Sequence, residues 1–158
     1  MPLPMTNPSS APLALESIAS AARERDVFEA VEFAGERLSC KARDAAADAF
    51  YRLESRNGRL FASLVTPDRW LSESIESDLM HYGDPLEELV AEELAEFDLE
   101  VPESELVVKH FRSDDLLYTF ETPLPPSIAA DADKTLRFLL AYEAAFRALG
   151  DMSGSDED

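Results

Sequence analysis

Two histidines and one cysteine are the side chains of this 158-residue chain that best suit acid–base, thiol or soft-metal chemistry. His81 lies near the end of an expected helix, and His110 lies within an expected strand. A zinc site or a nucleophilic centre would need them to converge with Cys or Asp partners, and no motif spacing supplies such partners. Cys40 alternates with Leu38 and Ala42, a pattern typical of a small buried hydrophobe on a strand. We therefore expect structural roles for all three.

The five glycines form none of the spacings that bind phosphates or present a nucleophile. The patterns G-x-G-x-x-G, G-x-x-x-x-G-K and G-x-S-x-G are all absent from the sequence. The carboxylates follow no calcium-loop spacing, and no histidine accompanies them. The sequence therefore predicts no catalytic residue, no cofactor site and no metal site, and we interpret the chain as a non-enzyme.

Acidic residues dominate the middle of the chain. Residues 70–108 contain thirteen Asp or Glu and no Lys or Arg, in a chain whose formal net charge is −19. In a helix, Glu88, Glu92 and Glu96 would share one face, where each like-charged pair costs about 0.2–0.5 kcal/mol. A solvated face, or adaptation to salt, would explain this charge. The alternative is a docking surface for a basic segment of a protein partner, and its candidate residues are Glu88, Glu92, Glu96 and Asp98.

The same charge constrains other partners and the location. A nucleic-acid duplex or an anionic bilayer repels a chain at −19 unless its cations are clustered, so we expect neither as a partner. No segment approaches the roughly twenty apolar residues that span a bilayer. A single cysteine allows no intrachain disulfide, and the first residues lack the basic and apolar regions of a secretion signal. These features favour a cytoplasmic location, and we expect a bacterial source.

The elements that must position these residues form one domain. Residues 1–10 contain three prolines and are typical of a flexible leader. Residues 11–150 are long enough for a single α+β domain with a hydrophobic core. Residues 151–158 are acidic and contain Gly and Ser, so we expect a disordered tail.

The strongest local pattern is a hairpin around Asn57-Gly58. Strand-like runs at residues 48–54 and 59–66 flank this pair, and Asn-Gly is preferred in type I′ turns because both positions take positive φ. This loop predicts cross-strand pairs of Tyr51 with Leu64 and of Leu53 with Ala62.

The remaining patterns complete the order of the elements. Residues 27–34 fit either a helix or a strand, and we favour a helix. Hairpin-connected strands are antiparallel, so we expect an antiparallel sheet of about five strands, in groups of three and two, with N-terminal, central and C-terminal helices packed on it. The other expected elements are a helix at 12–25, a strand at 37–43, a helix that Thr66 and Pro67 open and Gly83 ends, a helix at 84–98 with a capping box of Asp84 and Glu87, strands at 105–111 and 116–121, and a helix at 128–149.

This order resembles the type III secretion chaperone-like fold, including its YbjN-type members. The resemblance covers residues 12–149 and rests on element order, size and acidity. Members of that family are homodimeric and non-enzymatic, so the resemblance implies a homodimer here. It assigns no site residue.

We interpret the chain as a protein-binding or chaperone-like domain that holds a partner polypeptide on its sheet or along its acidic helix. The alternative is a small-molecule-binding or enzymatic domain with a pocket between sheet and helices. In that case His110 or Tyr118 would meet several carboxylates in the pocket.

Overall fold

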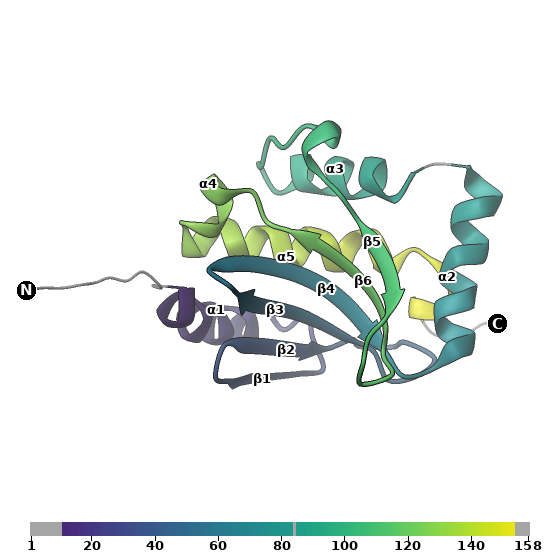
Figure 1. Ribbon diagram of the computed structural model, residues 1–158, viewed down its shortest axis with the longest axis horizontal. Coiled ribbons are helices and arrows are strands. Elements are labelled where there is room, and N and C mark those ends of the chain that lie inside the picture. The colour runs from purple at the N-terminus through teal and green to yellow at the C-terminus, as the bar shows by residue number, and fades with distance from the viewer. Residues whose placement is uncertain (1–10, 84, 154–158) are drawn as a thin grey trace, which may run out of the picture.

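The computed structural model describes residues 11–83 and 85–153, and its centre is one antiparallel sheet of six strands (Figure 1). The α+β class is confirmed, and the sheet has one strand more than expected. The predicted leader, residues 154–158 of the predicted tail, and Asp84 lie outside the described residues. The strands are β1 (Ala30–Ala34), β2 (Arg37–Lys41), β3 (Phe50–Arg56), β4 (Arg59–Thr66), β5 (Lys109–Arg112) and β6 (Tyr118–Pro123), in the spatial order β1-β2-β3-β4-β6-β5.

The additional strand lies where the sequence was ambiguous. β1 occupies most of residues 27–34, so the helix that we favoured there is wrong. A turn through Gly35, with φ of 62°, brings β1 antiparallel to β2. The pleat then half-buries Val31 and Phe33 on the core side of the sheet. Pairing with β2 decides the conformation, and a local pattern cannot reveal that pairing.

The hairpin of β3 and β4 forms as expected. Asn57 and Gly58 have φ of 54° and 77°, the left-handed values that a type I′ turn requires. All four side chains of the expected core pairs are buried. The register aligns Tyr51 with Leu64 and Leu53 with Ala62.

Two helices, α1 (Ala11–Arg25) and α5 (Ala132–Arg147), cover one face of the sheet, which is the rear face in Figure 1. The core lies between these helices and the sheet. No helix of residues 11–83 or 85–153 covers the opposite face, and we call it the open face (Figure 1). The largest fully buried side chains of this core include Leu15, Ile18, Leu38, Leu53, Tyr51, Phe138, Tyr142 and Phe146.

The expected C-terminal helix is divided in two. A short helix, α4 (Pro126–Ala129), precedes α5, because Asp131 interrupts the helix and caps α5. The Asp131 carboxylate accepts a hydrogen bond from the backbone N–H of Lys134 at 3.0 Å.

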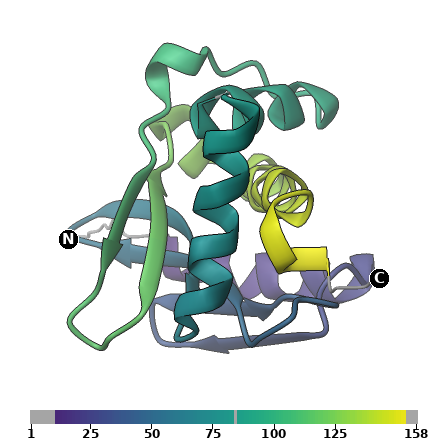
Figure 2. The same ribbon diagram turned by 90° about the vertical axis from the view of Figure 1, so that its right-hand side faces the viewer.

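Two further helices flank the sheet: α2 (Arg69–Tyr82) lies across one end of it, and α3 (Leu86–Glu96) lies on the side of the edge strand β5 and packs against α5 (Figure 1 and Figure 2). The cap of α2 is Asp68, which accepts from the backbone N–H of Leu71 at 2.8 Å, so the prediction of Thr66 as cap is wrong. Thr66 instead donates its hydroxyl hydrogen to the carbonyl of Asp48 at 2.7 Å. Gly83 ends α2 with φ of 79°, as expected.

The chain after α5 returns to α2. We expected a disordered tail from residue 151, but Gly150–Ser153 form a 3₁₀ turn, η3, and Met152 is only 1% exposed. The N–H of Gly150 donates to Asp78 Oδ2 at 2.6 Å. Gly150 has φ of 52°, and a Cβ there would lie 2.4 Å from Ser74 Oγ. Glycine is therefore required for this close approach to α2.

The second hairpin begins later than expected. Residues 103–105 form a 3₁₀ turn, η2 (Glu103–Glu105), so β5 starts at Lys109 rather than at residue 105. Within the described part of the chain, no helix combines the length and the apolar composition needed to cross a bilayer.

Candidate functional site

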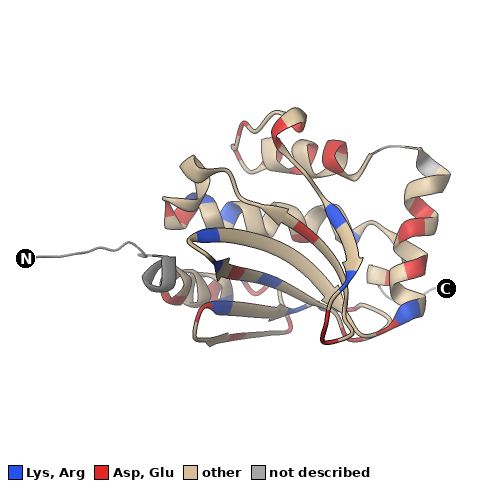
Figure 3. Cartoon of the chain, viewed as in Figure 1, with Lys and Arg blue, Asp and Glu red and all other residues tan. Residues whose placement is uncertain are grey.

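The four predicted partner-binding residues lie on α3 and on the turn after it (Figure 3). Glu92, Glu96 and Asp98 are exposed, and Glu88 is half-buried. We call these four residues the acidic ridge. Binding of a partner there stays a prediction. The opposite side of α3 packs into the core through Leu86, Val90 and Leu94.

A cleft of about 300 Å³ lies between α2, α3 and the edge strand β5. Its walls are mainly apolar, and its polar groups are two carboxylates and one imidazole. Pockets for small ligands begin at about this size. The lining residues are Glu76, Leu79 and Met80 of α2, Leu86 and Glu87 of α3, Val108 and His110 near or in β5, and Phe120 of β6.

His110 forms one wall of this cleft. Its ring stacks on Phe120, with centroids 3.9 Å apart and planes inclined by 6°. Its Nε2 lies 3.2 Å from Ser72 Oγ, and its Nδ1 lies 3.5 Å from Glu76 Oε2. A carboxylate can only accept, so we assign the ring hydrogen to Nδ1 and take the hydroxyl of Ser72 as the donor to Nε2.

Ser72, His110 and Glu76 have the order of a nucleophile, a base and an orienting carboxylate. Ser72, however, is only 1% exposed, so a substrate carbonyl has no approach to its Oγ. The hydrogen bond instead fixes the orientation of the imidazole. Burial lowers the pKa of His110, and the nearby Glu76 carboxylate opposes this shift. His110 is therefore neutral at pH 7.

Glu87 joins α3 to the start of β5. Its Oε2 accepts a hydrogen bond from the backbone N–H of Val108 at 3.1 Å. We expected this side chain in a capping box, but Pro85 caps α3 without a side-chain hydrogen bond. The contact with Val108 holds α3 against β5 and so sets the width of the cleft.

Large apolar side chains are exposed around the cleft. Met80 is 84% exposed at its edge, and Val107, next to the lining residue Val108, is 48% exposed. The α2 and α3 walls carry carboxylates and no Lys or Arg beyond Arg69 (Figure 3). The cleft therefore combines apolar surface with negative charge.

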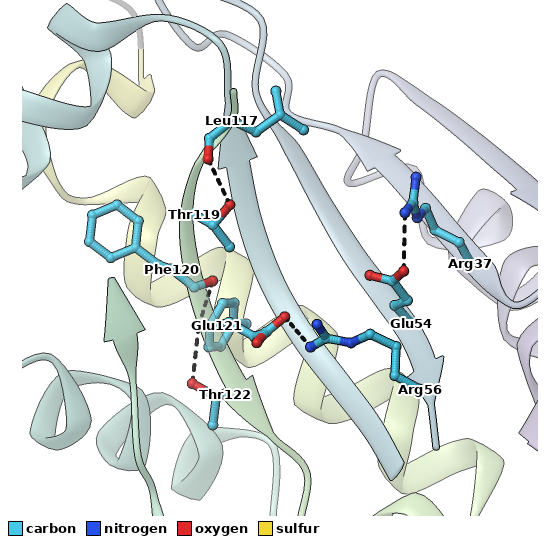
Figure 4. A network of polar contacts seen from close by, with 9 residues as sticks. Arg37, Glu54, Arg56, Leu117, Thr119, Phe120, Glu121 and Thr122 are labelled. Carbon is cyan, nitrogen blue, oxygen red and sulfur yellow. Dashed lines mark hydrogen bonds and ion pairs between the residues drawn. The ribbon is translucent and has the colours of Figure 1, made fainter. Parts of the chain in front are cut away.

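The open face of the sheet carries a different arrangement, in which charges are paired across strands (Figure 4). Arg37 Nη2 lies 3.0 Å from Glu54 Oε2, and Arg56 pairs with Glu121. The guanidinium of Arg56 also lies over the ring of Phe61, 4.2 Å from its centroid. The sequence alone does not reveal these partners, because Glu54 and Glu121 lie on other strands than the arginines that they pair with.

Cys40 is buried, as expected. Burial raises the pKa of its thiol to about 12, so the reactive thiolate is absent at neutral pH. Among the described residues, no group of three or more His, Cys, Asp or Glu side chains is placed to hold a metal ion.

A scan against protein-family models and searches of the curated proteins and of the solved structures found no match to this chain. The resemblance to the type III secretion chaperone-like fold therefore stays an expectation. The fold and the site together define an antiparallel α+β domain. Its cleft, beside the edge strand β5, has mainly apolar walls and carries negative charge.

Proposed function

We propose that this domain binds a segment of another protein in the cleft between α2, α3 and β5, and that it catalyses no reaction. The observation that carries the proposal is the cleft of about 300 Å³, with its mainly apolar walls. Met80, 84% exposed at its edge, is an apolar side chain that a partner would cover. Exposed apolar surface beside a polar rim is typical of protein-binding sites.

The occupant that fits these walls is a basic amphipathic segment. Its apolar side chains would enter the cleft, as in helix-in-groove recognition. Its Lys or Arg side chains would lie near Glu76 and the acidic ridge, since residues 70–108 contain no cation of their own. The negative field would also raise the rate of association with a basic segment.

The size of the cleft limits the affinity. A volume of about 300 Å³ suits one or two apolar side chains rather than a whole folded surface. Each such side chain contributes about 1.5–3 kcal/mol when it is fully buried. Ordering of the segment offsets part of this gain, so we expect micromolar dissociation constants.

The test uses fluorescence anisotropy of a labelled amphipathic helix of Leu and Lys as the probe. Met80→Asp places a charge at the edge of the cleft and should weaken binding about tenfold or more. The matched control is Leu116→Asp, because Leu116 is also exposed, lies in the β5–β6 turn and has φ of 65°, which Asp tolerates. The control should change the affinity less than about twofold.

Two results would contradict the proposal. One is equal loss of affinity in both variants, since binding would then not use the cleft. The other is equal binding of a matched Leu and Glu helix, since charge would then play no part.

We further propose that the chain forms a homodimer, which the family resemblance implies, and that it acts in the cytoplasm, which its single cysteine favours. Sedimentation equilibrium measures the mass in solution directly. A mass equal to that of one chain at micromolar concentration would reject the dimer, and recovery of the protein from a compartment other than the cytoplasm would reject the location.

A further inference from the structure

Arg52 lies at the centre of the open face, between two small side chains. The strand register places Ser39 of β2 on one side of it and Ser63 of β4 on the other. Serines beside a long arginine leave space that bulkier residues would fill. A hollow of about 230 Å³ lies on the Ser63 side of Arg52, with Val65 and Phe111 among its apolar walls.

The charge of the Arg52 guanidinium is only partly compensated, by attraction to Glu54 and Asp115, which do not contact it directly. Its Nε is buried and makes no hydrogen bond, and the side chain forms no ion pair within the described residues. Burial lowers the pKa of Arg52 and repulsion by Arg37 lowers it further, whereas attraction by Glu54 and Asp115 partly opposes the shift. A buried donor without an acceptor costs about 1–3 kcal/mol, and more when the group is charged. The Nη atoms of Arg52 are not among the buried atoms without a partner, so an anion in the hollow would meet this end of the guanidinium.

The neighbouring charges are already paired. Glu54 accepts from Arg37 at 3.0 Å, and Glu121 accepts from Arg56. Asp115, at the tip of the β5–β6 hairpin, accepts from the hydroxyl of its neighbour Ser113 at 2.5 Å. Asp114 also lines the hollow, and within the described residues none of these four carboxylates forms an ion pair with Arg52. The position opposite its guanidinium is open to an acceptor from outside.

We infer that this hollow binds the carboxylate of a small apolar acid. A carboxylate matches the planar fork of a guanidinium and forms two parallel hydrogen bonds with it. The hydroxyl of Ser63, which donates no hydrogen bond within the described residues, provides a further donor. Val65 and Phe111 would contact the apolar part of the ligand.

The carboxylates that line the hollow favour a ligand with a single negative charge over one with two. Four carboxylates, Glu54, Asp114, Asp115 and Glu121, line the same space, so a dianion such as phosphate meets more repulsion than a monoanion does. This site lies on the open face, away from the cleft proposed for the partner segment, and either site can exist without the other.

The test is an NMR titration of the ¹⁵N-labelled full chain with sodium benzoate, followed at the Arg Nε–H signals. We expect one saturable shift, with a dissociation constant of about 1–10 mM. Arg52→Met should weaken binding about tenfold or more. Arg59→Met, which removes an exposed arginine at the end of the same hairpin, should change it less than about twofold.

Two further probes and one further variant complete the design. Phosphate and benzylamine should give no saturable shift. Arg52→Lys keeps the charge but loses the fork, and should still weaken benzoate binding about threefold or more if Arg52→Met does not fold. The inference is overturned if benzoate does not saturate by about 50 mM, if both Arg52 variants bind as the parent does, or if phosphate binds as tightly as benzoate.

Discussion

The cleft beside β5 and the open face of the sheet are both concave, yet they use charge in opposite ways. In the cleft, the helices α2 and α3 place carboxylates beside apolar surface without cations between them. On the open face, alternation along the strands brings two arginines, Arg37 and Arg56, into cross-strand ion pairs with Glu54 and Glu121. The strand positions that share this face with Arg52 hold six cations, Arg37, Lys41, Arg52, Arg56, Arg59 and Lys109, and three acids, Glu32, Glu54 and Glu121.

The difference shows that a net charge of −19 is not spread evenly over the molecule. The charges at the strand positions of the open face sum to +3, and residues 70–108 contain no Lys or Arg. The overall composition does not reveal either of these local differences. The two surfaces therefore suit ligands of opposite charge, namely a basic segment for the cleft and a carboxylate for the open face.

Among the changes that should affect the cleft and the open face differently, Gly150→Ala is expected to have the largest effect. The new Cβ would lie 2.4 Å from Ser74 Oγ and 2.7 Å from the backbone N of Ile75, at a φ of 52° that disfavours a side chain. Since η3 holds α2 in place, we expect the free energy of unfolding to fall by roughly 2–4 kcal/mol. Urea unfolding measures this change directly.

Gly35→Ala is the matched control for that variant. Gly35 also has positive φ, of 62°, but no atom lies within 4 Å of the place that a Cβ would occupy, so only backbone strain of about 1–2 kcal/mol applies. The excess loss in Gly150→Ala reports the contact with α2. Equal losses in the two variants would show that η3 does not support α2. Binding at the cleft should weaken in Gly150→Ala while benzoate binding at Arg52 persists.

Local patterns in the sequence were enough to predict the elements that depend on neighbouring residues. Asn57-Gly58 predicted the β3–β4 hairpin and its register because that turn needs only two residues with positive φ. Gly83 predicted the end of α2 for the same kind of reason. Residues 27–34 were assigned wrongly because β1 depends on pairing with β2, which no local pattern contains.

The candidate site could be predicted only in part. The acidic residues of α3 were evident from their spacing, whereas the partners of His110 were not. Ser72 lies 38 positions before His110, and the two meet only because α2 packs beside β5. The hollow at Arg52 likewise requires the register of β2, β3 and β4 together. Contacts between distant segments follow from tertiary packing, which one sequence without its fold does not specify.

A smaller effect is expected when the pH is lowered. It should act through His110 in the cleft and leave the open face unchanged. Burial lowers the pKa of His110 in the folded chain below its ordinary value of 6.5. Well above pH 6.5 the imidazole is neutral in both states and contributes nothing to pH dependence. As the pH falls below 6.5, the unfolded chain takes up the proton more readily than the folded chain, so folding stability is lost until the folded-state pKa is also passed.

Urea unfolding of the parent and of His110→Gln between pH 7.5 and pH 5 tests this argument, because the titration of the many carboxylates is common to both and cancels in the difference. The parent should lose stability relative to the variant as the pH falls. A relative gain in the parent would mean that the carboxylate of Glu76, 3.5 Å from Nδ1, outweighs burial and raises the pKa of His110.

Protonated His110 would also repel the basic segment proposed for the cleft, since it faces the same space as Glu76 and Glu87. Benzoate binding at Arg52 should stay constant over this range, because His110 projects from the opposite side of the sheet.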